Sequence, residues 1–98
     1  MDKYFELNGI TFVWDEDKAQ PNPHHHEGIT FEQATEAFFD PFLRIIDASR
    51  NNEERDAIIG MDKRWNLLFV VHIAFEEDFI RIISARYADH RERRNYED

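Results

Sequence analysis

The sequence of 98 residues contains no cysteine, and it has only three prolines and three glycines. Without cysteine the chain forms no disulfide bonds and no thiolate metal sites, which excludes the class of small disulfide-stabilised secreted domains. It also lacks a long hydrophobic run. The longest, residues 67–71, is far too short to span a bilayer, and the N-terminus has no apolar signal core. We therefore expect a cytoplasmic protein with no membrane partner.

Aromatic residues, by contrast, are abundant. Nine Phe, two Trp and three Tyr accompany an apolar content of 42% and a charged content of 34%. Each aromatic side chain can bury about 150–250 Å², so a chain of this length can build one hydrophobic core but not two. The composition predicts a single domain over residues 1–98.

The charged residues are unevenly distributed along the chain. The formal net charge is −9, and residues 1–40 carry nine acids against two bases. Residues 79–98 carry four acids and five bases, and all five bases are arginine. Such an acidic chain is a poor non-specific ligand for nucleic acid. Its arginine cluster can nevertheless hold phosphate or a carboxylate-rich partner at one place, and a basic partner can cover the acidic part.

The N-terminal third is predicted to begin with a strand and a short helix. Alternating apolar residues indicate a strand over residues 10–14, directly after the turn signal Asn8-Gly9. Asp15 is a suitable N-cap for a helix over residues 16–20, which the two prolines that follow must end or kink.

A second, clearer helix is predicted from residue 30 onwards. Thr30 and Gln33 fit a capping box, and Pro41 marks the end of the helix. The apolar residues that share one helical face are Phe31, Ala34, Phe38 and Phe39.

The remainder of the chain is predicted to be mainly strand. The expected strands are residues 42–47, 57–60, 67–75 and 79–85, with a polar loop over 48–54, a turn over 61–64 and a hairpin around Glu76-Glu77. A short polar helix over residues 91–98, capped by Asp89 or Glu92, ends the chain. This order predicts the α+β class: a mainly antiparallel sheet of about four to five strands, two N-terminal helices and a short C-terminal helix.

Two groups of residues follow the pattern of a known family. The first is Phe12-Val13-Trp14-Asp15-Glu16, Lys18-Ala19, Asn22, His26, Gly28-Ile29-Thr30-Phe31-Glu32, Ala34 and Phe39-Asp40-Pro41. The second is Ile59-Gly60, Leu67-Leu68, Val70-Val71-His72, Ile80-Arg81-Ile82-Ile83-Ser84-Ala85-Arg86, and Arg91-Glu92-Arg93-Arg94 with Tyr96-Glu97. On these residues, which span nearly the whole chain, the sequence resembles the BrnT toxin family.

The resemblance implies a compact RelE-like fold and the toxin half of a bacterial type II toxin–antitoxin pair. It implies an endoribonuclease that cleaves RNA without a metal or other cofactor and so inhibits translation and growth. The implied partner is a small BrnA-like antitoxin with a ribbon-helix-helix domain, encoded beside the toxin. Operator DNA would then be contacted only through the toxin–antitoxin complex.

Metal-free RNA cleavage needs a base for the 2′-hydroxyl, an acid for the departing 5′-oxygen and cations for the charged phosphorus. The resemblance makes His26 the first acid–base candidate, because it lies at the motif position and an unperturbed histidine has a pKa of about 6.5. The other catalytic candidates are Arg86, Arg81 and His72. The alternative for His26 is a solvated loop histidine.

The predicted hairpin determines which of these residues face each other across the strands and which share a face. With an even loop centred on Glu76-Glu77, His72 faces Arg81 across the two strands; the alternative is a core histidine satisfied by a hydrogen bond. Arg81 and Arg86 are five residues apart, so they lie on opposite faces unless the strand bulges or ends between them. Alternatively, Arg81 forms a structural salt bridge with Glu76, Glu77 or Asp78.

The candidate RNA-binding residues are His25, Tyr87, Arg91, Arg94 and Tyr96. Arginines can contact the RNA backbone or the antitoxin, and tyrosines can stack on bases. The alternatives are a solvated helix face, on which Arg93 pairs with Glu97 at i, i+4, and Tyr96 as an anchor for the last helix.

Two further interpretations remain open. The run His24-His25-His26 invites a metal site, but it lacks the i, i+4 spacing of zinc-binding histidines on a helix, so we expect no metal. The chain also departs from the family pattern, since His25 replaces the usual lysine and Tyr87 a usual basic residue. These departures, with the acidic residues 76–78, favour the alternative of a weakened or inactive member that acts as an antitoxin-binding module.

Overall fold

The computed structural model describes residues 1–19 and 28–98. In chain order the elements are β1 (Asp2–Leu7), β2 (Ile10–Asp15), α1 (Glu16–Ala19), α3 (Phe31–Glu36), η1 (Ala37–Phe39), β3 (Arg44–Asp47), β4 (Asp56–Met61), β5 (Leu67–Glu76), β6 (Phe79–Tyr87) and α4 (His90–Glu97). The α+β class is therefore confirmed. No helix among the described residues is long and apolar enough to cross a membrane.

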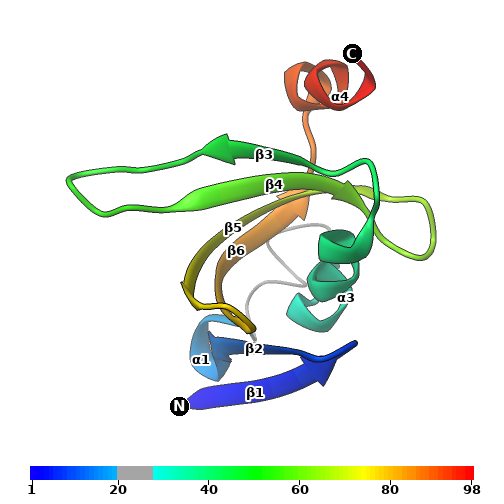
Figure 1. Cartoon of the computed structure of the whole chain (residues 1–98). Helices are drawn as coiled ribbons and strands as arrows, with labels where there is room; N and C mark the ends of the chain where they lie inside the picture. The colour runs from blue at the N-terminus through cyan, green and yellow to red at the C-terminus, as the bar shows by residue number, and fades with distance from the viewer. Residues whose placement is uncertain (20–27) are drawn as a thin grey trace.

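The six strands form one mixed sheet in the order β1-β2-β6-β5-β4-β3. All neighbouring pairs are antiparallel except β2 and β6, which run parallel. In Figure 1 the sheet is strongly curved: α3 lies in its hollow, below β4, whereas α4 lies above β3 and β4 on the other side. The two faces of the sheet thus lie next to different helices, α3 on one face and α4 on the other.

The expected count of four to five strands is wrong, because β1 adds an edge strand that the sequence reading missed. Asn8 and Gly9, with φ values of 52° and 84°, form the two-residue turn that joins β1 to β2, and Leu7 pairs with Ile10 across it. An Asn-Gly turn with both residues at positive φ is the preferred connection of a tight hairpin. The turn signal therefore marked a whole hairpin and not only the start of β2.

The hydrophobic core lies between α3 and the hollow side of the sheet. Its fully buried side chains include Phe12 and Trp14 of β2, Phe31 of α3 and Ile82 of β6. The ring of Trp14 meets that of Phe31 edge-on at 5.8 Å between centroids. The predicted helix from residue 30 is confirmed as α3 continued by η1, and the hydroxyl of Thr30 accepts the Gln33 N–H at 3.0 Å as its N-cap. The aromatic side chain on α3 thus packs against residues of the sheet that come from both ends of the sequence.

The buried carboxylate of Asp40 ties α4 to the rest of the molecule. It accepts the Tyr96 hydroxyl at 2.5 Å and the backbone N–H groups of Met61 and Phe42, each at 2.8 Å. Burial raises the pKa of Asp40, but these three hydrogen bonds outweigh it, so its pKa lies below the ordinary value. Burial and the same hydrogen bond raise the pKa of Tyr96 to about 12. Tyr96 therefore anchors α4, as one of the two sequence interpretations proposed.

A second buried carboxylate, Asp62, organises the β4–β5 turn. It accepts Gln33 Nε2 of α3 at 2.7 Å and the backbone N–H groups of Arg64 and Asn66 at 2.8 and 2.9 Å. Burial raises the pKa of Asp62, but the hydrogen bonds, first among them those from Gln33 and Asn66, have the larger effect. The pKa of Asp62 therefore lies below its ordinary value. The turn is thereby fixed to the helix.

Stability is expected to fall in acid through these two groups. Their folded-state pKa values lie below the unfolded value of 3.8, so their stabilising contribution is present above about pH 4 and is lost as the pH falls through the folded values. Urea unfolding at pH 7 and pH 3 measures the loss. Asp62→Asn keeps one acceptor oxygen but does not titrate, and so should show a smaller difference between the two pH values. An equal loss in both proteins would contradict the assignment to Asp62.

Candidate functional site

A bulge in β6 determines which arginines share a face of the sheet. Val71 pairs with Ser84 and His72 pairs with Ile82, so the intervening Ile83 has no partner on β5. This extra residue shifts the alternation of β6 by one position. A bulge between Arg81 and Arg86 is one of the conditions under which the two share a face, and β6 has one at Ile83.

The consequence is a polar row on the side of the sheet opposite α3. Ile82 and Ala85 belong to the core beneath α3, so Arg81, Ser84 and Arg86 point to the other side. Arg81 pairs with Ile73 and Arg86 with Phe69, four residues apart on β5, which corresponds to about 13 Å along the strand. The side chains of Arg81 and Arg86 thus lie on the same face of the sheet but at different positions along β6.

Part of this face is hollowed into a groove of about 410 Å³. Its apolar floor is formed by Phe69 and Val71 of β5 with Ile46 of β3. The polar residues around it are Asp47, Ser49, Arg50, Arg55, Ser84 and Arg86. Three guanidinium groups around an apolar floor can contact phosphate oxygens and offer a flat surface to a base. We refer to it below as the arginine groove.

Arg86 is the most firmly held cation of the arginine groove. Its Nη1 and Nη2 each donate to one carboxylate oxygen of Glu92 at 2.7 Å, and its guanidinium carbon lies 4.2 Å from the centre of the Phe69 ring. The hydrogen bond from Arg86 to Glu92 raises the pKa of Arg86 further above its ordinary value. Arg86 is therefore charged and oriented, and one carboxylate already occupies the fork that a phosphate would use.

Glu92 also caps α4. Asp89 accepts the Glu92 N–H and the Glu92 side chain accepts the Asp89 N–H, both at 2.8 Å, so the predicted capping of the last helix is confirmed as a capping box. The Glu92 carboxylate thus takes part in the N-terminal cap of α4 and also binds Arg86. These contacts place the first turn of α4 beside the arginine groove.

Arg50 and Arg55 enter the arginine groove from the β3–β4 hairpin, and sequence reasoning missed both. Asn51 and Asn52 have φ values of 54° and 67°, and Arg50 and Glu53 exchange two backbone hydrogen bonds around them, which folds the expected loop 48–54 into a tight hairpin. The Asn-Asn pair was the available signal for this turn.

The two hairpin arginines differ in their partners. Arg55 donates to Glu53 at 2.6 Å, but its buried Nε has no hydrogen-bond partner among the described residues. Arg50 takes part in none of the ion pairs found between described residues. An unpaired buried N–H is costly, so the Arg55 Nε is a donor that an incoming anion would satisfy.

Arg81 and His72 do not meet, so the predicted cross-strand pair is wrong. Arg81 is bound to Asp2 of β1 at 2.7 Å, which confirms a structural salt bridge but with none of the three partners expected. His72 is 6% exposed on the α3 side of the sheet, with its ring 4.9 Å from that of Phe38. Burial lowers the pKa of His72, which favours the neutral ring. The register of β5 and β6 pairs His72 with Ile82 and Arg81 with Ile73, and the bulge turns Arg86 to the face opposite His72.

The predicted RNA-binding residues of the C-terminal segment are dispersed. Tyr87 packs against the core on the α3 side, and Tyr96 is bound to Asp40. Arg91 and Arg94 are exposed on α4 and form no ion pair with another described residue. The expected Arg93–Glu97 pair is present at 4.0 Å. Only Arg91 and Arg94 are therefore both exposed and unpaired.

His25 and His26 lie outside the described residues, as does the whole run 24–26 considered as a metal site. Within residues 1–19 and 28–98, no three His, Asp or Glu side chains are grouped so that they could hold a metal ion. The described part of the candidate site therefore consists of three arginines, Asp47, two serines and an apolar floor.

Comparison with known protein families gives a match over residues 14–92 to the ribonuclease toxin BrnT of type II toxin–antitoxin systems. The search of curated proteins finds no match. The matched segment runs from Trp14 in the core to Glu92 in the capping box, and it includes all the residues that line the arginine groove. Since the match covers most of the 98 residues, the chain belongs to the BrnT ribonuclease toxin family of type II toxin–antitoxin systems.

Proposed function

We propose that the chain is a metal-independent endoribonuclease that binds the RNA backbone in the arginine groove and is neutralised by a BrnA-like ribbon-helix-helix antitoxin. The observation that supports this best is the bulge at Ile83, which turns Arg86 and Ser84 towards the same groove as Arg50 and Arg55. The fold and the family are consistent with an RNA substrate, and the cleavage of mRNA would inhibit translation and growth.

In this mechanism Arg86 holds the scissile phosphate. Its planar fork binds two phosphate oxygens and stabilises the extra negative charge of the pentavalent phosphorus. Arg55 and Arg50 contact the flanking backbone, and a base lies over Phe69 and Val71. Arg91, Arg94 and Arg81 extend the cationic track, since they lie on α4 and further along the same sheet face.

Proton transfer is assigned to His26, on the family resemblance alone. As a base it takes the proton of the 2′-hydroxyl, whose oxygen attacks the phosphorus. The bond from phosphorus to the 5′-oxygen breaks, a water molecule donates a proton to the departing 5′-oxygen, and a 2′,3′-cyclic phosphate remains. His25 is assigned to RNA binding. His72 has no role in this mechanism, because it is buried on the other side of the sheet.

The function is tested with purified full-length chain separated from its antitoxin. We expect cleavage of single-stranded RNA in the presence of excess EDTA, with products that end in a cyclic phosphate, and growth arrest when the chain is expressed alone. Activity that disappears in EDTA and returns with one added metal would overturn the metal-independent mechanism. Intact RNA and normal growth would overturn the nuclease.

Glu92→Gln is expected to strengthen RNA binding by roughly three- to tenfold, because glutamine can still accept the Asp89 N–H in the capping box but no longer neutralises Arg86. Fluorescence anisotropy with a labelled RNA measures the change in Kd. Glu97→Gln is the matched control, since Glu97 lies on the same helix and contacts only Arg93 at 4.0 Å. Equal effects of the two substitutions would show a general charge effect without a role for Arg86.

One observation favours the alternative of an inactive, antitoxin-binding member. Two of the three cations in the arginine groove, Arg55 and Arg86, are already paired with carboxylates of the same chain. Replacement of those carboxylates by RNA therefore costs part of the binding energy. Antitoxin binding without RNA cleavage in the experiment above would establish this alternative.

A further inference from the structure

A second cavity lies on another part of the molecule, away from the arginine groove. It has a volume of about 280 Å³ and is lined from three places: the β1–β2 turn, the end of α3 with η1, and the β4–β5 turn. Its apolar lining residues are Leu7, Phe39, Pro41, Met61 and Trp65. None of its lining residues also lines the arginine groove.

Trp65 is the unusual residue of this cavity. Its side chain is 81% exposed, and its backbone has a φ of 67°, in the left-handed region that bulky side chains rarely adopt. The surrounding turn enforces this conformation, because the Asp62 carboxylate accepts the N–H groups of Arg64 and Asn66 on either side of it. The chain thus exposes a large aromatic side chain to solvent, in an unfavourable backbone conformation that burial against the described residues does little to offset.

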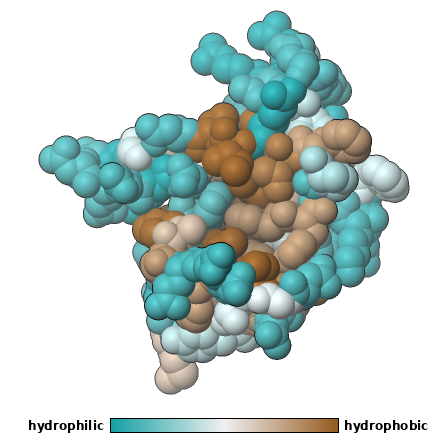
Figure 2. Space-filling view, in the orientation of Figure 1, coloured by the Kyte–Doolittle hydropathy of each residue, from teal (hydrophilic) through white to brown (hydrophobic). Residues whose placement is uncertain are grey.

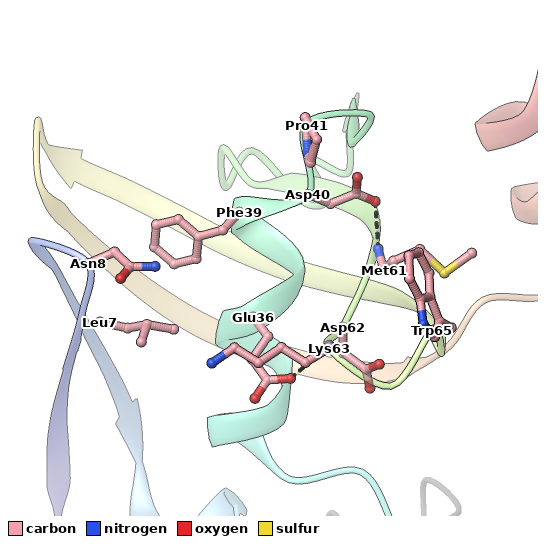
Figure 3. Close-up of a pocket in the computed structure, with 10 residues that line it drawn as sticks. All are labelled: Leu7, Asn8, Glu36, Phe39, Asp40, Pro41, Met61, Asp62, Lys63 and Trp65. Carbon is pink, nitrogen blue, oxygen red and sulfur yellow. Dashed lines mark hydrogen bonds between the residues drawn. The ribbon is translucent and has the colours of Figure 1, made fainter.

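The cavity continues into an exposed apolar surface. Figure 3 shows Trp65 and Met61 at one end, Leu7 and Phe39 at the other, and Glu36 and Lys63 between them. Phe39 and the nearby Phe42 are 37% and 73% exposed. In the orientation of Figure 1, Figure 2 shows apolar side chains across the middle of the molecule, with hydrophilic ones on α4 and at the β3–β4 turn. Exposed apolar patches of this kind mark contact surfaces.

The size and charge of the cavity restrict its occupant. The cavity, of about 280 Å³, has room for one or two side chains of a partner. Its charged lining residues are three acids, Glu36, Asp40 and Asp62, and one base, Lys63, in a chain with a net charge of −9. Charge complementarity therefore favours a basic partner with an apolar anchor.

We propose that this cavity is the docking site of the antitoxin, which inserts an apolar side chain beside Trp65 and places a lysine or arginine next to Glu36. The family supplies the class of partner, and to that extent the inference rests on the proposed function. Because the cavity and the arginine groove share no lining residue, the contact at Trp65 can be removed without a change to the groove.

The test uses the full-length chain and the product of the reading frame adjacent to its gene, with Kd measured by titration calorimetry. Trp65→Asn removes the aromatic anchor, while asparagine tolerates a left-handed backbone, so the free protein should unfold at the same or a higher temperature. Binding should weaken at least about 30-fold, as expected for an interfacial tryptophan. Phe75→Asn is the matched control at an aromatic residue that is 50% exposed and does not line the cavity.

A second variant tests the charge. Glu36→Gln keeps an oxygen that can accept the Lys63 N–H, which Glu36 accepts at 3.0 Å, but removes the negative charge. Binding should weaken about two- to fivefold, and its dependence on salt should decrease. Wild-type affinity in Trp65→Asn would overturn the proposal, as would no binding of the adjacent product to the wild-type chain. So would a Trp65-dependent dimer of the chain alone, which would assign the surface to self-association.

RNA cleavage by the free variants separates the two proposals. Trp65→Asn should cleave RNA as fast as the wild type while it escapes the antitoxin. If neither protein cleaves RNA but only the wild type binds the partner, the docking site is established and the nuclease is rejected. If wild type and Trp65→Asn both cleave RNA and both bind the partner with equal affinity, the nuclease is established and the docking site is rejected.

Discussion

Arg86→Ala is expected to abolish the growth arrest caused by expression of the chain and to lower the rate of RNA cleavage by about 100- to 1,000-fold. Among the three groove arginines of the described structure, Arg86 is the one stacked on a ring, with Phe69 at 4.2 Å, and this contact does not require Glu92 in its fork. A preorganised cation stabilises a charged transition state more than a mobile one. Single-turnover cleavage of a labelled RNA and a plating assay measure the effect.

The controls separate loss of charge from loss of structure. Arg86→Lys keeps the charge without the planar fork and should retain only a small part of the activity. Arg93→Ala removes an arginine that contacts only Glu97, at 4.0 Å, and should leave cleavage within about twofold of the wild type. Arg86→Ala that unfolds at the wild-type temperature and yet cleaves RNA at the wild-type rate would remove Arg86 from the mechanism.

Gly60→Ala is expected to destabilise the fold by about 3 kcal/mol, the upper end of the cost of overpacking. A Cβ atom at Gly60 would lie 2.5 Å from the backbone oxygen of Ala37, and a backbone atom cannot move aside as a flexible side chain can. The substitution forces β4 away from η1 and therefore opens the core. For a domain of this size the thermal midpoint should fall by roughly 12–24 °C.

Gly9→Ala is the matched control, because its added Cβ would meet no atom within 4 Å. Its φ of 84° still disfavours alanine, at a cost of about 1 kcal/mol. The two substitutions therefore separate steric overlap from backbone strain. A loss at Gly60 no larger than that at Gly9 would show that β4 and η1 can move apart without cost.

Local sequence signals were sufficient to predict most of the fold. The alternation in residues 10–14, the Thr30 cap and the apolar runs of β5 and β6 all correspond to elements of the structure. β1 was missed because its burial alternates only between exposed and half-buried residues, so it has no fully buried stripe. An edge strand that contributes little to the core leaves a weak hydrophobic pattern.

The candidate site was less predictable, for a different reason. Arg86 was identified from the family pattern, but Arg50 and Arg55 reach the arginine groove only because Asn51 and Asn52 turn the hairpin back. The hairpin turn at residues 77–78, with a register shift next to it, pairs Arg81 with Ile73, and the bulge at Ile83 then turns Arg86 to the same face. A shift of one residue moves every side chain beyond it to the other face of the sheet. The free energy that favours the bulge comes from many contacts between residues distant in sequence, so no local signal marks it.

The parallel pairing of β2 with β6 has a consequence for synthesis on the ribosome. β2 lies at residues 10–15, but it pairs with β6 at residues 79–81, so the two can join only after these residues have emerged. Contacts between residues so far apart form late and slowly. A nascent chain therefore lacks both the completed sheet and the face that carries Arg86 until β6 has been translated. A premature stop codon before β6 should yield a harmless fragment.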